Sequence, residues 1–274
     1  MVLFRNVAVV GLGLIGGSLA GDIRGLGLAD NLIGISRRQE TIRAAKRRGF
    51  VDRASGDIRA VRGCDLVILC APVKAIIGLL ADIAPYLSRG AIVTDVGSTK
   101  VEIVRRAKQA LPAGVSFVGG HPLAGSEKAG IGQASRGLFG NSCCILTPGK
   151  GINKVKALWQ ALGSRVKVWQ PEEHDRIVSF ISQLPHLAAF GLVCAIPEKF
   201  LPYGSGGLKD TTRIAASSPC LWRDIFLSNK NFALQALKAF RKQLGELEGL
   251  IRGGDEQGLF KKIEKASRLR RAFS

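Results

Sequence analysis

The stretch Val7-Ala8-Val9-Val10-Gly11-Leu12-Gly13-Leu14-Ile15-Gly16-Gly17-Ser18 organises the rest of the chain. Its apolar start predicts a buried strand, and the glycines predict a tight turn into an apolar helix. In such a unit Gly11 allows the turn, Gly13 lets the backbone approach a pyrophosphate, and Gly16 lets the helix pack closely on the strand. Unpaired N–H groups at the helix start would face the phosphates. The predicted dinucleotide contacts are Gly11, Gly13, Leu14, Ile15 and Gly16; the alternative is that these glycines only shape a turn.

Length and composition limit the class of protein. The chain has 274 residues, 46% of them hydrophobic, which suffices for one or two buried cores, and we expect two domains. The longest apolar stretch away from the N-terminus, Leu187–Ile196, is shorter than the roughly 20 residues that cross a bilayer, so we expect no membrane anchor. Glycines interrupt the N-terminal apolar run, which is therefore not typical of a signal peptide. We expect a cytoplasmic protein.

The cysteines and histidines argue against a metal site. The six cysteines form no Cys-x-x-Cys pair, and most lie in apolar runs such as Val67–Cys70, so we expect reduced, buried thiols. The three histidines, His121, His174 and His186, are widely spaced. We expect no bound metal, because metal ligation needs clustered ligands.

The charge balance raises nucleic-acid binding as an alternative function. The formal net charge is +19, and a dense basic surface can bind phosphate backbones. The basic residues are nevertheless spread over most predicted helices, with concentrations at 37–48 and 261–271, and aromatic residues do not interleave with them. We interpret the charge as solvated helix faces that also attract anionic ligands, and expect no nucleic-acid partner.

The end of the second predicted strand, Leu32–Ser36, bears on the choice of cofactor. A fold selective for NAD places an acidic residue there, whereas this chain has Ser36, Arg37 and Arg38. Guanidinium groups suit a 2′-phosphate, so we favour NADP, with NAD possible. The alternative is that both arginines are surface residues without a ligand.

Strands and helices alternate through the first 170 residues. Alternation predicts an α/β domain with a parallel sheet, in which ligands bind beyond the carboxyl ends of the strands. The loops Cys70-Ala71-Pro72 and Asp95–Lys100 lie at such ends, and we place Ser98 near the nicotinamide or, alternatively, as the cap of the following helix. The expected strands are 7–10, 32–36, 65–70, 91–94, 115–118, 143–147 and 166–169, and the expected helices begin near residues 14 and 39 and span 74–86, 99–110 and 152–162.

His121 follows the strand at 115–118, on a predicted turn flanked by Gly119 and Gly120. Its unperturbed pKa near 6.5 leaves imidazole largely neutral at pH 7, as a general base must be. The alternative role is a structural hydrogen bond.

From Pro171 onward the strand pattern stops. Pro171 with Glu172 and Glu173 predicts a helix start, and the apolar residues that follow recur at helical spacing. Further helices are expected at 221–228, 232–249 and 255–267. We therefore expect a Rossmann-type doubly wound domain over residues 1–170 and an all-helical domain over 171–274 that binds substrate and forms a homodimer.

Several motifs together resemble the prephenate and arogenate dehydrogenases of tyrosine biosynthesis, over nearly the whole chain. They are Gly11–Ser18, Asp95–Lys100, Gly119–Glu127, His174-Asp175, Ser182–His186, Asp210–Ala215 and Trp222. The resemblance implies an oxidative decarboxylation, in which a cyclohexadienol gives a hydride to NAD(P)⁺ while its ring carboxylate leaves as CO₂ and the ring becomes aromatic.

The resemblance also implies roles for individual residues. His121 would accept the hydroxyl proton of the substrate, and Ser98 would assist at that hydroxyl and the nicotinamide. Arg213 would bind a substrate carboxylate through its planar fork, and His186 would contact the substrate from the helical domain. Ser126, Glu127, Asp210 and Trp222 correspond to positions that line or gate the pocket, with interdomain packing as the alternative.

One departure from the family pattern bears on the substrate. Many members carry Ser-His-Leu-Pro-His where this chain has Ser182-Gln183-Leu184-Pro185-His186, which puts any contact of that first histidine in doubt. The retained His186 favours the keto acid prephenate over the amino acid arogenate, and a dual-substrate enzyme is the further alternative. The chain leaves no stretch for a mutase or regulatory domain, so we expect a monofunctional enzyme.

Two other classes remain as alternatives. A hydroxyacid dehydrogenase would usually offer a catalytic lysine on the first long helix of the second domain, and the helix from Pro171 has none in its first turns. A basic binding protein without enzymatic activity would shift nucleic acid in a salt-sensitive manner.

Overall fold

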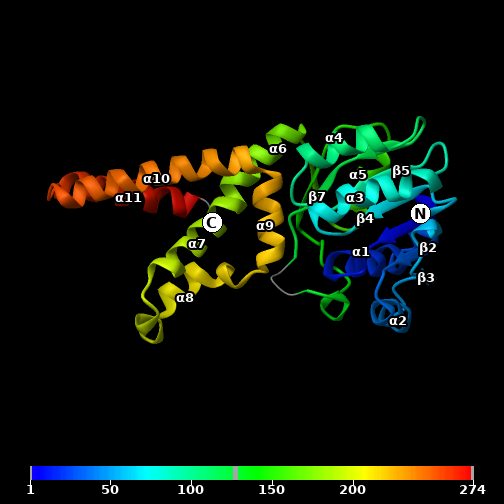
Figure 1. The fold of residues 1–274 in the computed structure, drawn as a ribbon, viewed down its shortest axis with the longest axis horizontal. Coiled ribbons are helices and arrows are strands. Elements are labelled where there is room, and N and C mark those ends of the chain that lie inside the picture. Colours follow the sequence, from blue (N-terminus) through cyan, green and yellow to red (C-terminus); the bar gives the residue numbers. More distant parts are fainter. Residues whose placement is uncertain (1, 126–128, 273–274) are drawn as a thin grey trace.

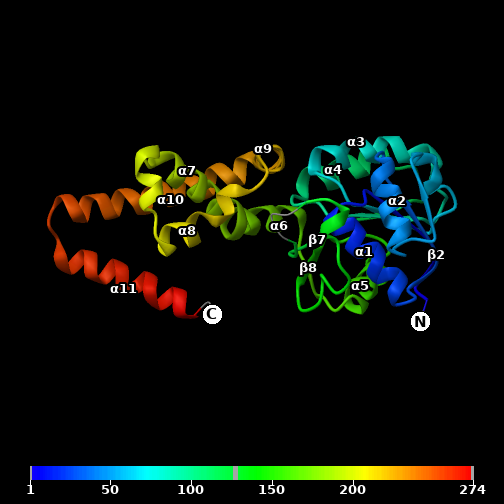
Figure 2. The same ribbon diagram turned by 90° about the horizontal axis from the view of Figure 1, so that it is seen from below.

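The computed structural model describes residues 2–125 and 129–272. Two lobes lie side by side along the long axis of the molecule: a sheet lobe, residues 4–125 and 129–168, and a helical lobe, residues 171–272 (Figure 1). In the view from below, α10 and α11 extend from the helical lobe as an antiparallel pair, so that α11 returns toward the sheet lobe (Figure 2). Ser126 and Glu127, both predicted pocket residues, lie outside the described residues.

The larger sheet has the strand order of a dinucleotide-binding fold. Its order is β3-β2-β1-β4-β5-β6 and all its pairs are parallel, which confirms the predicted doubly wound class. The order reverses between β1 and β4, so a crevice opens at the carboxyl ends of these strands. The strands are β1 (Phe4–Val10), β2 (Ala29–Ile35), β3 (Arg53–Ser55), β4 (Leu66–Leu69), β5 (Ile92–Asp95) and β6 (Ser116–Val118).

Apolar side chains cover both faces of this sheet, as expected for parallel strands. Along β1, Val7 and Val9 join one buried cluster, whereas Ala8 and Val10 join the other. The first cluster packs against α1 and α5, and the second against α3 and α4. These helices are α1 (Leu14–Gly25), α3 (Val73–Ile83), α4 (Val101–Ala110) and α5 (Ile152–Ala161), with α2 (Gln39–Arg47) beside β2 and β3.

The remaining strands form a separate three-stranded sheet that the alternation did not predict. Strands β7 (Gly120–Pro122) and β8 (Cys143–Leu146) are antiparallel, and β9 (Arg165–Val168) is parallel to β8. Only Gly119 separates β6 from β7, and one residue cannot make the crossover that a further parallel strand requires. His121 therefore lies in a short strand and not on the predicted turn, opposite Ile145.

The helical lobe begins at Pro171, as predicted. Its elements are α6 (Pro171–Val178), a π-helical turn (Ser179–Gln183), α7 (Leu184–Ala195), α8 (Gly206–Thr212), α9 (Pro219–Ser228), α10 (Lys230–Arg252) and α11 (Glu256–Ala272). Helix α8 was not predicted, because glycines and threonines dominate it. Short 3₁₀ segments occupy Ile58–Val61, Ala84–Tyr86, Ile131–Gln133, Glu198–Tyr203 and Arg213–Ala216.

The first helical segment of this lobe corrects one expectation. Pro171–Ala195 forms a helical segment of 25 residues that is long and apolar enough, by length and composition, to cross a membrane. The apolar stretch at 187–196, on which the expectation of no membrane anchor was based, covers only the end of this segment. Only 22% of its most apolar window is buried within the described chain. Its first turns, however, bury His174 and Asp175 completely. Since buried polar residues need protein partners, we interpret the apolar character of this segment as packing between protein surfaces.

The cysteines also differ in part from expectation. Cys64 and Cys144 are buried, but Cys194 and Cys220 are exposed, because they lie on helices of the lobe that buries little of its own surface. Among the described residues, no group of three His, Cys, Asp or Glu side chains is placed to hold a metal ion.

Candidate active site

The glycine turn between β1 and α1 has the geometry that each glycine's proposed role requires. Gly11 has φ +97°, and a Cβ there would lie 2.1 Å from the carbonyl oxygen of Cys70. A Cβ on Gly16 would lie 1.8 Å from the carbonyl oxygen of Gly11, so the helix packs directly on the turn. A Cβ on Gly13 would meet nothing within 4 Å. The backbone at Gly13 is thus open to a pyrophosphate at the start of α1.

This turn forms one wall of a cavity of about 800 Å³ between the two lobes. The sheet lobe contributes the predicted residues Gly13, Leu14, Ile15, Gly16, Cys70, Ala71, Pro72, Ser98 and His121, and the helical lobe contributes His186, Arg213 and Trp222. The structure therefore brings together residues that are up to 209 positions apart in the sequence, from Gly13 to Trp222. A smaller cavity of about 430 Å³, at the amino-terminal edge of the sheet, contains none of the predicted site residues.

Some predicted residues do not line the cavity. Gly11 belongs to the turn but does not line the cavity, and Asp210 is exposed on α8. Ser36, Arg37 and Arg38 lie between β2 and α2, where the Ser36 hydroxyl accepts a hydrogen bond from the Arg38 backbone N–H at 3.3 Å. They are at the carboxyl end of a strand next to β1, which is where an adenosine ribose would extend from the glycine turn.

A buried ion pair fixes the strand that carries His121. Lys100 and Asp95 form this pair, and both side chains are fully buried. The ammonium of Lys100 also donates to the carbonyl of Gly120 at 2.6 Å, and the carboxylate of Asp95 accepts from the Gly120 N–H at 3.1 Å. Both backbone groups next to His121 are thereby held to β5 and the loop after it.

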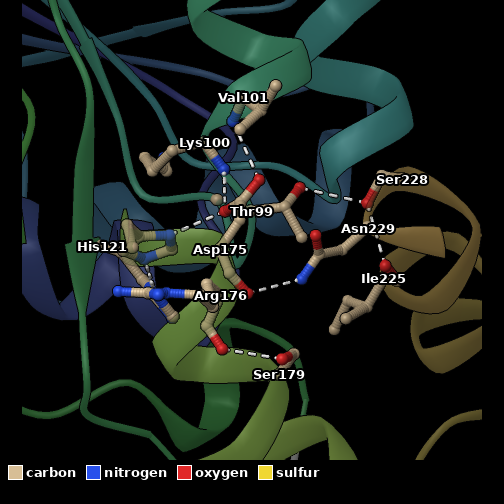
Figure 3. A network of polar contacts seen from close by, with 12 residues as sticks. Thr99, Lys100, Val101, His121, Asp175, Arg176, Ser179, Ile225, Ser228 and Asn229 are labelled. Carbon is tan, nitrogen blue, oxygen red and sulfur yellow. Dashed lines mark hydrogen bonds and ion pairs between the residues drawn. The ribbon is translucent and has the colours of Figure 1, made fainter. Parts of the chain in front are cut away.

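His121 is the first member of a chain of polar contacts that reaches the helical lobe (Figure 3). Its Nδ1 lies 2.8 Å from Nε2 of His174, and Nδ1 of His174 lies 2.7 Å from a carboxylate oxygen of Asp175. The two rings meet edge to face, with centroids 5.0 Å apart. Among the predictions, His174-Asp175 contributed to the family resemblance but had no role in the site.

The carboxylate of Asp175 also caps a helix of the other lobe. It accepts hydrogen bonds from the backbone N–H groups of Lys100 and Val101, at 2.7 and 2.9 Å, at the start of α4. Asn229, on the helical lobe, donates to the backbone carbonyl of Asp175 at 2.8 Å (Figure 3). The helix-capping role considered for Ser98 thus belongs to Asp175.

The surroundings of the histidines lower their pKa values. Burial, then the neighbouring His174 and the cation of Lys100, hold the pKa of His121 well below its usual range. Burial also lowers the pKa of His174, against the opposing effect of Asp175. The ring of His121 is therefore neutral at pH 7 and opens in part to the cavity.

The opposite wall of the cavity is aromatic. The ring of His186 stacks on Trp222 with centroids 3.5 Å apart, and the ring of Phe226 packs against Trp222 with centroids 5.2 Å apart. Nδ1 of His186 lies 2.9 Å from the carbonyl oxygen of Ser182, on the π-helical turn. Since a carbonyl only accepts, Nδ1 carries the hydrogen. Burial lowers the pKa of His186, which leaves its Nε2 as an acceptor.

The fold and the site define a class of protein. A doubly wound sheet with a glycine turn, a neutral histidine in a cavity beside that turn, and a helical lobe closing the cavity are the features of a two-domain dehydrogenase.

Comparison with known proteins narrows this class to one family. The family model described as prephenate dehydrogenase, nucleotide-binding domain, matches residues 19–168, and the model described as prephenate dehydrogenase, dimerization domain, matches residues 170–265. The chain belongs to the prephenate dehydrogenase family.

Individual relatives agree. The prephenate dehydrogenase of Bacillus subtilis is 36% identical over 95% of this chain and 74% of its own length. The cyclohexadienyl dehydrogenase of Zymomonas mobilis is 33% identical over 100% of this chain and 97% of its own length. The crystal structure of prephenate dehydrogenase from A. aeolicus, in complex with hydroxyphenyl propionate and NAD⁺, has a TM-score of 0.93 and 35% identity, covering 98% of both chains.

Proposed function

We propose that this chain catalyses the oxidative decarboxylation of prephenate to 4-hydroxyphenylpyruvate, with His121 as the general base. The observation that carries the proposal is the position of His121, a neutral imidazole at the cavity wall between the glycine turn and the His186–Trp222 wall. A neutral base next to a nucleotide turn can accept the hydroxyl proton of a substrate whose hydride leaves toward the cofactor. Formation of the aromatic ring, as CO₂ leaves, drives the reaction.

A nicotinamide nucleotide would bind along the carboxyl ends of β1, β2 and β4. The open backbone at Gly13 and the start of α1 fit its pyrophosphate, and the loop Cys70–Pro72 lines the path toward His121. When bound, this group accepts the hydride. Burial raises the pKa of the Cys70 thiol, so that side chain acts as an uncharged wall beside the cofactor.

The cofactor preference that we propose is NADP. Arg37 and Arg38 are exposed at the end of β2, where a 2′-phosphate of the adenosine ribose would lie, and guanidinium groups bind phosphate oxygens in pairs. The A. aeolicus relative binds NAD⁺, and NAD is the alternative for this chain.

The other predicted residues divide into four groups. Ser98 lines the cavity with His121 and would hydrogen-bond the substrate hydroxyl or the nicotinamide amide. Arg213 reaches the cavity from the helical lobe and would bind a substrate carboxylate. Trp222 and His186 provide a flat apolar surface for the six-membered ring. Ser126, Glu127 and Asp210 remain candidates for the cavity mouth.

The hydrogen bonding of His186 favours arogenate as a second candidate substrate. Its acceptor Nε2 can receive a hydrogen bond from an ammonium group, whereas the pyruvyl carbonyl of prephenate needs a donor. The net charge of +19 on the chain favours prephenate, because the ammonium group of arogenate would be repelled by the positively charged protein.

We further propose a cytoplasmic homodimer formed through the helical lobe, with the domain boundary between residues 170 and 171. The family model for residues 170–265 is described as a dimerization domain. Exposed apolar side chains on α7, α10 and α11, including Leu192, Leu244 and Phe260, would lie in or near the interface.

The test is a measurement of absorbance at the reduced-nicotinamide band, with prephenate and arogenate each combined with NAD⁺ and NADP⁺. We expect the highest kcat/KM with prephenate and NADP⁺. Activity only with arogenate would overturn the substrate, and activity only with NAD⁺ would overturn the cofactor preference. No reduction in any combination would contradict the proposed reaction.

A further inference from the structure

The contacts of His121 restrict where its hydrogen lies. The carboxylate of Asp175 accepts two backbone N–H groups at the start of α4, so it is an acceptor toward His174 as well. Nδ1 of His174, at 2.7 Å from that carboxylate, must therefore carry a hydrogen. A neutral His174 then has a lone pair on Nε2.

This lone pair determines the tautomer of His121. Nδ1 of His121 lies 2.8 Å from Nε2 of His174, and two lone pairs at that distance would repel. Nδ1 of His121 must carry its hydrogen, which leaves Nε2 as the basic atom. An isolated neutral imidazole has no partner to impose this arrangement, since the neighbour of one ring nitrogen decides the state of the other.

We infer that His174 and Asp175 are positioning residues, which fix His121 as its Nδ1–H tautomer and so direct its basic Nε2 to the substrate. The inference rests on the proposed role of His121 as base. When Nε2 takes the hydroxyl proton, the resulting imidazolium keeps its Nδ1–H bond to Nε2 of His174, and Nδ1–H of His174 keeps its bond to Asp175. No proton has to move along the chain, and the negative charge of Asp175 stabilises the new cation through His174.

Because His121 is surrounded by buried groups, an imidazolium there needs the compensating charge that Asp175 supplies through His174. Within residues 2–125 and 129–272, the charged groups that act on the two rings are Lys100 and Asp95, which neutralise each other, and Asp175. The thiol of Cys144, on the adjacent strand, is un-ionised because burial raises its pKa. Among the residues that the structure describes, Asp175 is thus the carboxylate that remains to compensate an imidazolium at His121. Its position is rigid, because α4 holds its side chain and Asn229 holds its backbone carbonyl.

The tautomer can be observed directly in the whole protein. The sequence has only three histidines, so ¹⁵N-histidine labelling gives a spectrum of three rings, which His174→Gln and His186→Gln variants assign by loss of one signal each. We expect neutral His121 to show a hydrogen on Nδ1 and a bare Nε2. A hydrogen on Nε2 in the unsubstituted protein would overturn the inference, whatever the activity.

Two substitutions separate positioning from structural support. In His174→Gln an amide oxygen lies near the place of the Nε2 atom and can accept the hydrogen bond from His121 in its stead. In His174→Phe this acceptor is lost, but an aromatic ring is kept. We expect His174→Phe to lower kcat roughly 10²-fold, the scale of general-base loss, and to release the tautomer of His121. His174→Gln should retain the tautomer and recover at least about tenfold of that loss.

The control is Ser179→Ala, also buried on the first helical segment, whose hydroxyl donates only to the carbonyl of Arg176. It should leave kcat within about twofold. Equal kcat in the His174→Phe and His174→Gln variants would show that His174 only packs against its neighbours and does not position His121. Loss of activity in His121→Asn together with normal activity in His174→Phe would leave the proposed base intact and refute only this inference.

Discussion

The two lobes bury their apolar residues in different ways. Both large apolar clusters of the described chain lie in the sheet lobe, and neither includes a residue beyond Val166. In the helical lobe, by contrast, large apolar side chains such as Leu192, Leu244, Ile251, Phe260 and Ile263 are exposed. The sheet lobe thus has a core of its own, whereas the helical lobe leaves apolar side chains exposed that the proposed dimer would cover.

The largest effect that we expect concerns the chemistry of the sheet lobe. His121→Asn removes the basic Nε2 atom but keeps a small polar side chain, so kcat should fall by roughly 10²-fold or more while the melting temperature stays nearly unchanged. Steady-state turnover and calorimetry check the two parts. Turnover close to that of the unsubstituted chain would remove His121 from the mechanism.

A pair of glycine variants separates folding from cofactor binding within the sheet lobe. Gly16→Ala forces a methyl group against the backbone carbonyl of Gly11, and should lower the free energy of unfolding by about 3 kcal/mol. Gly13→Ala has space for its methyl group in the free protein and should fold normally, but weaken nucleotide binding at least about tenfold. Denaturant unfolding and nucleotide titration measure the two quantities. Equal stability of both variants would contradict the assigned roles.

A matched pair of charged substitutions tests whether the helical lobe depends on a partner. Leu192, on α7, is 39% exposed, and Leu26, on the sheet lobe, is 52% exposed. Leu192→Glu should weaken the dimer by about 2 kcal/mol, roughly 30-fold in Kd, because a carboxylate would enter an apolar interface. Leu26→Glu should leave the dimer unchanged. Sedimentation at several concentrations distinguishes them, and equal Kd values would place the interface elsewhere.

The cofactor preference gives a smaller effect. Arg37→Ser should raise the KM for NADP⁺ about tenfold, with little effect on the KM for NAD⁺, because the lost charge-assisted bond serves the 2′-phosphate. Arg105→Ser, at an exposed position on α4, is the matched control for loss of one positive charge. A parallel rise for both cofactors would mean that Arg37 does not distinguish them.

The smallest effect is on the pH dependence of kcat/KM. A base with an ordinary histidine pKa would be half protonated near pH 6.5, whereas the pKa of His121 is lowered, so the neutral form persists there. Between pH 7.5 and 6.5 we expect kcat/KM to stay nearly constant, and to fall only at more acidic pH. An acid limb centred at or above pH 6.5 would contradict the environment described for His121.

The same lowered pKa values affect stability. Below pH 6.5 the unfolded chain binds protons at His121 and His174 that the folded chain does not bind. The free energy of unfolding therefore falls as pH falls below 6.5. Above that value both states have neutral histidines, and these residues no longer make the free energy of unfolding depend on pH. Denaturant unfolding at pH 7.5 and 5.5 measures this contribution.

Sequence patterns predicted the long, periodic and glycine-marked elements. The turn at Gly11–Gly16 has a local signature, and the alternation of strands with helices predicts a parallel sheet. Strand β3 was missed because Arg53–Ser55 shows no apolar pattern, and β7 was missed because the glycines before His121 predicted a turn. The division into two sheets was missed because it depends on the single residue Gly119 between β6 and β7.

Within the site, local signals named His121 and Ser98 but not the partners of His121. His121 and His174 are 53 residues apart, and only the docking of α6 on α4 brings them into contact. The available signal was the pair His174-Asp175 in the first turns of a helix, where polar residues are followed by an apolar face. Asn229 had no signal, because its contact with the carbonyl of Asp175 depends on how α10 packs.

The double use of Asp175 has a consequence for how the enzyme can malfunction. The carboxylate of Asp175, on the helical lobe, caps the start of α4 in the sheet lobe and, through His174, contacts the proposed base His121 of that same lobe. A chain whose lobes are misplaced relative to each other loses the orientation of its base together with the cap of α4. With His121 as the proposed base, we expect molecules with misplaced lobes to be inactive, so that product forms only where the pocket between the lobes is complete.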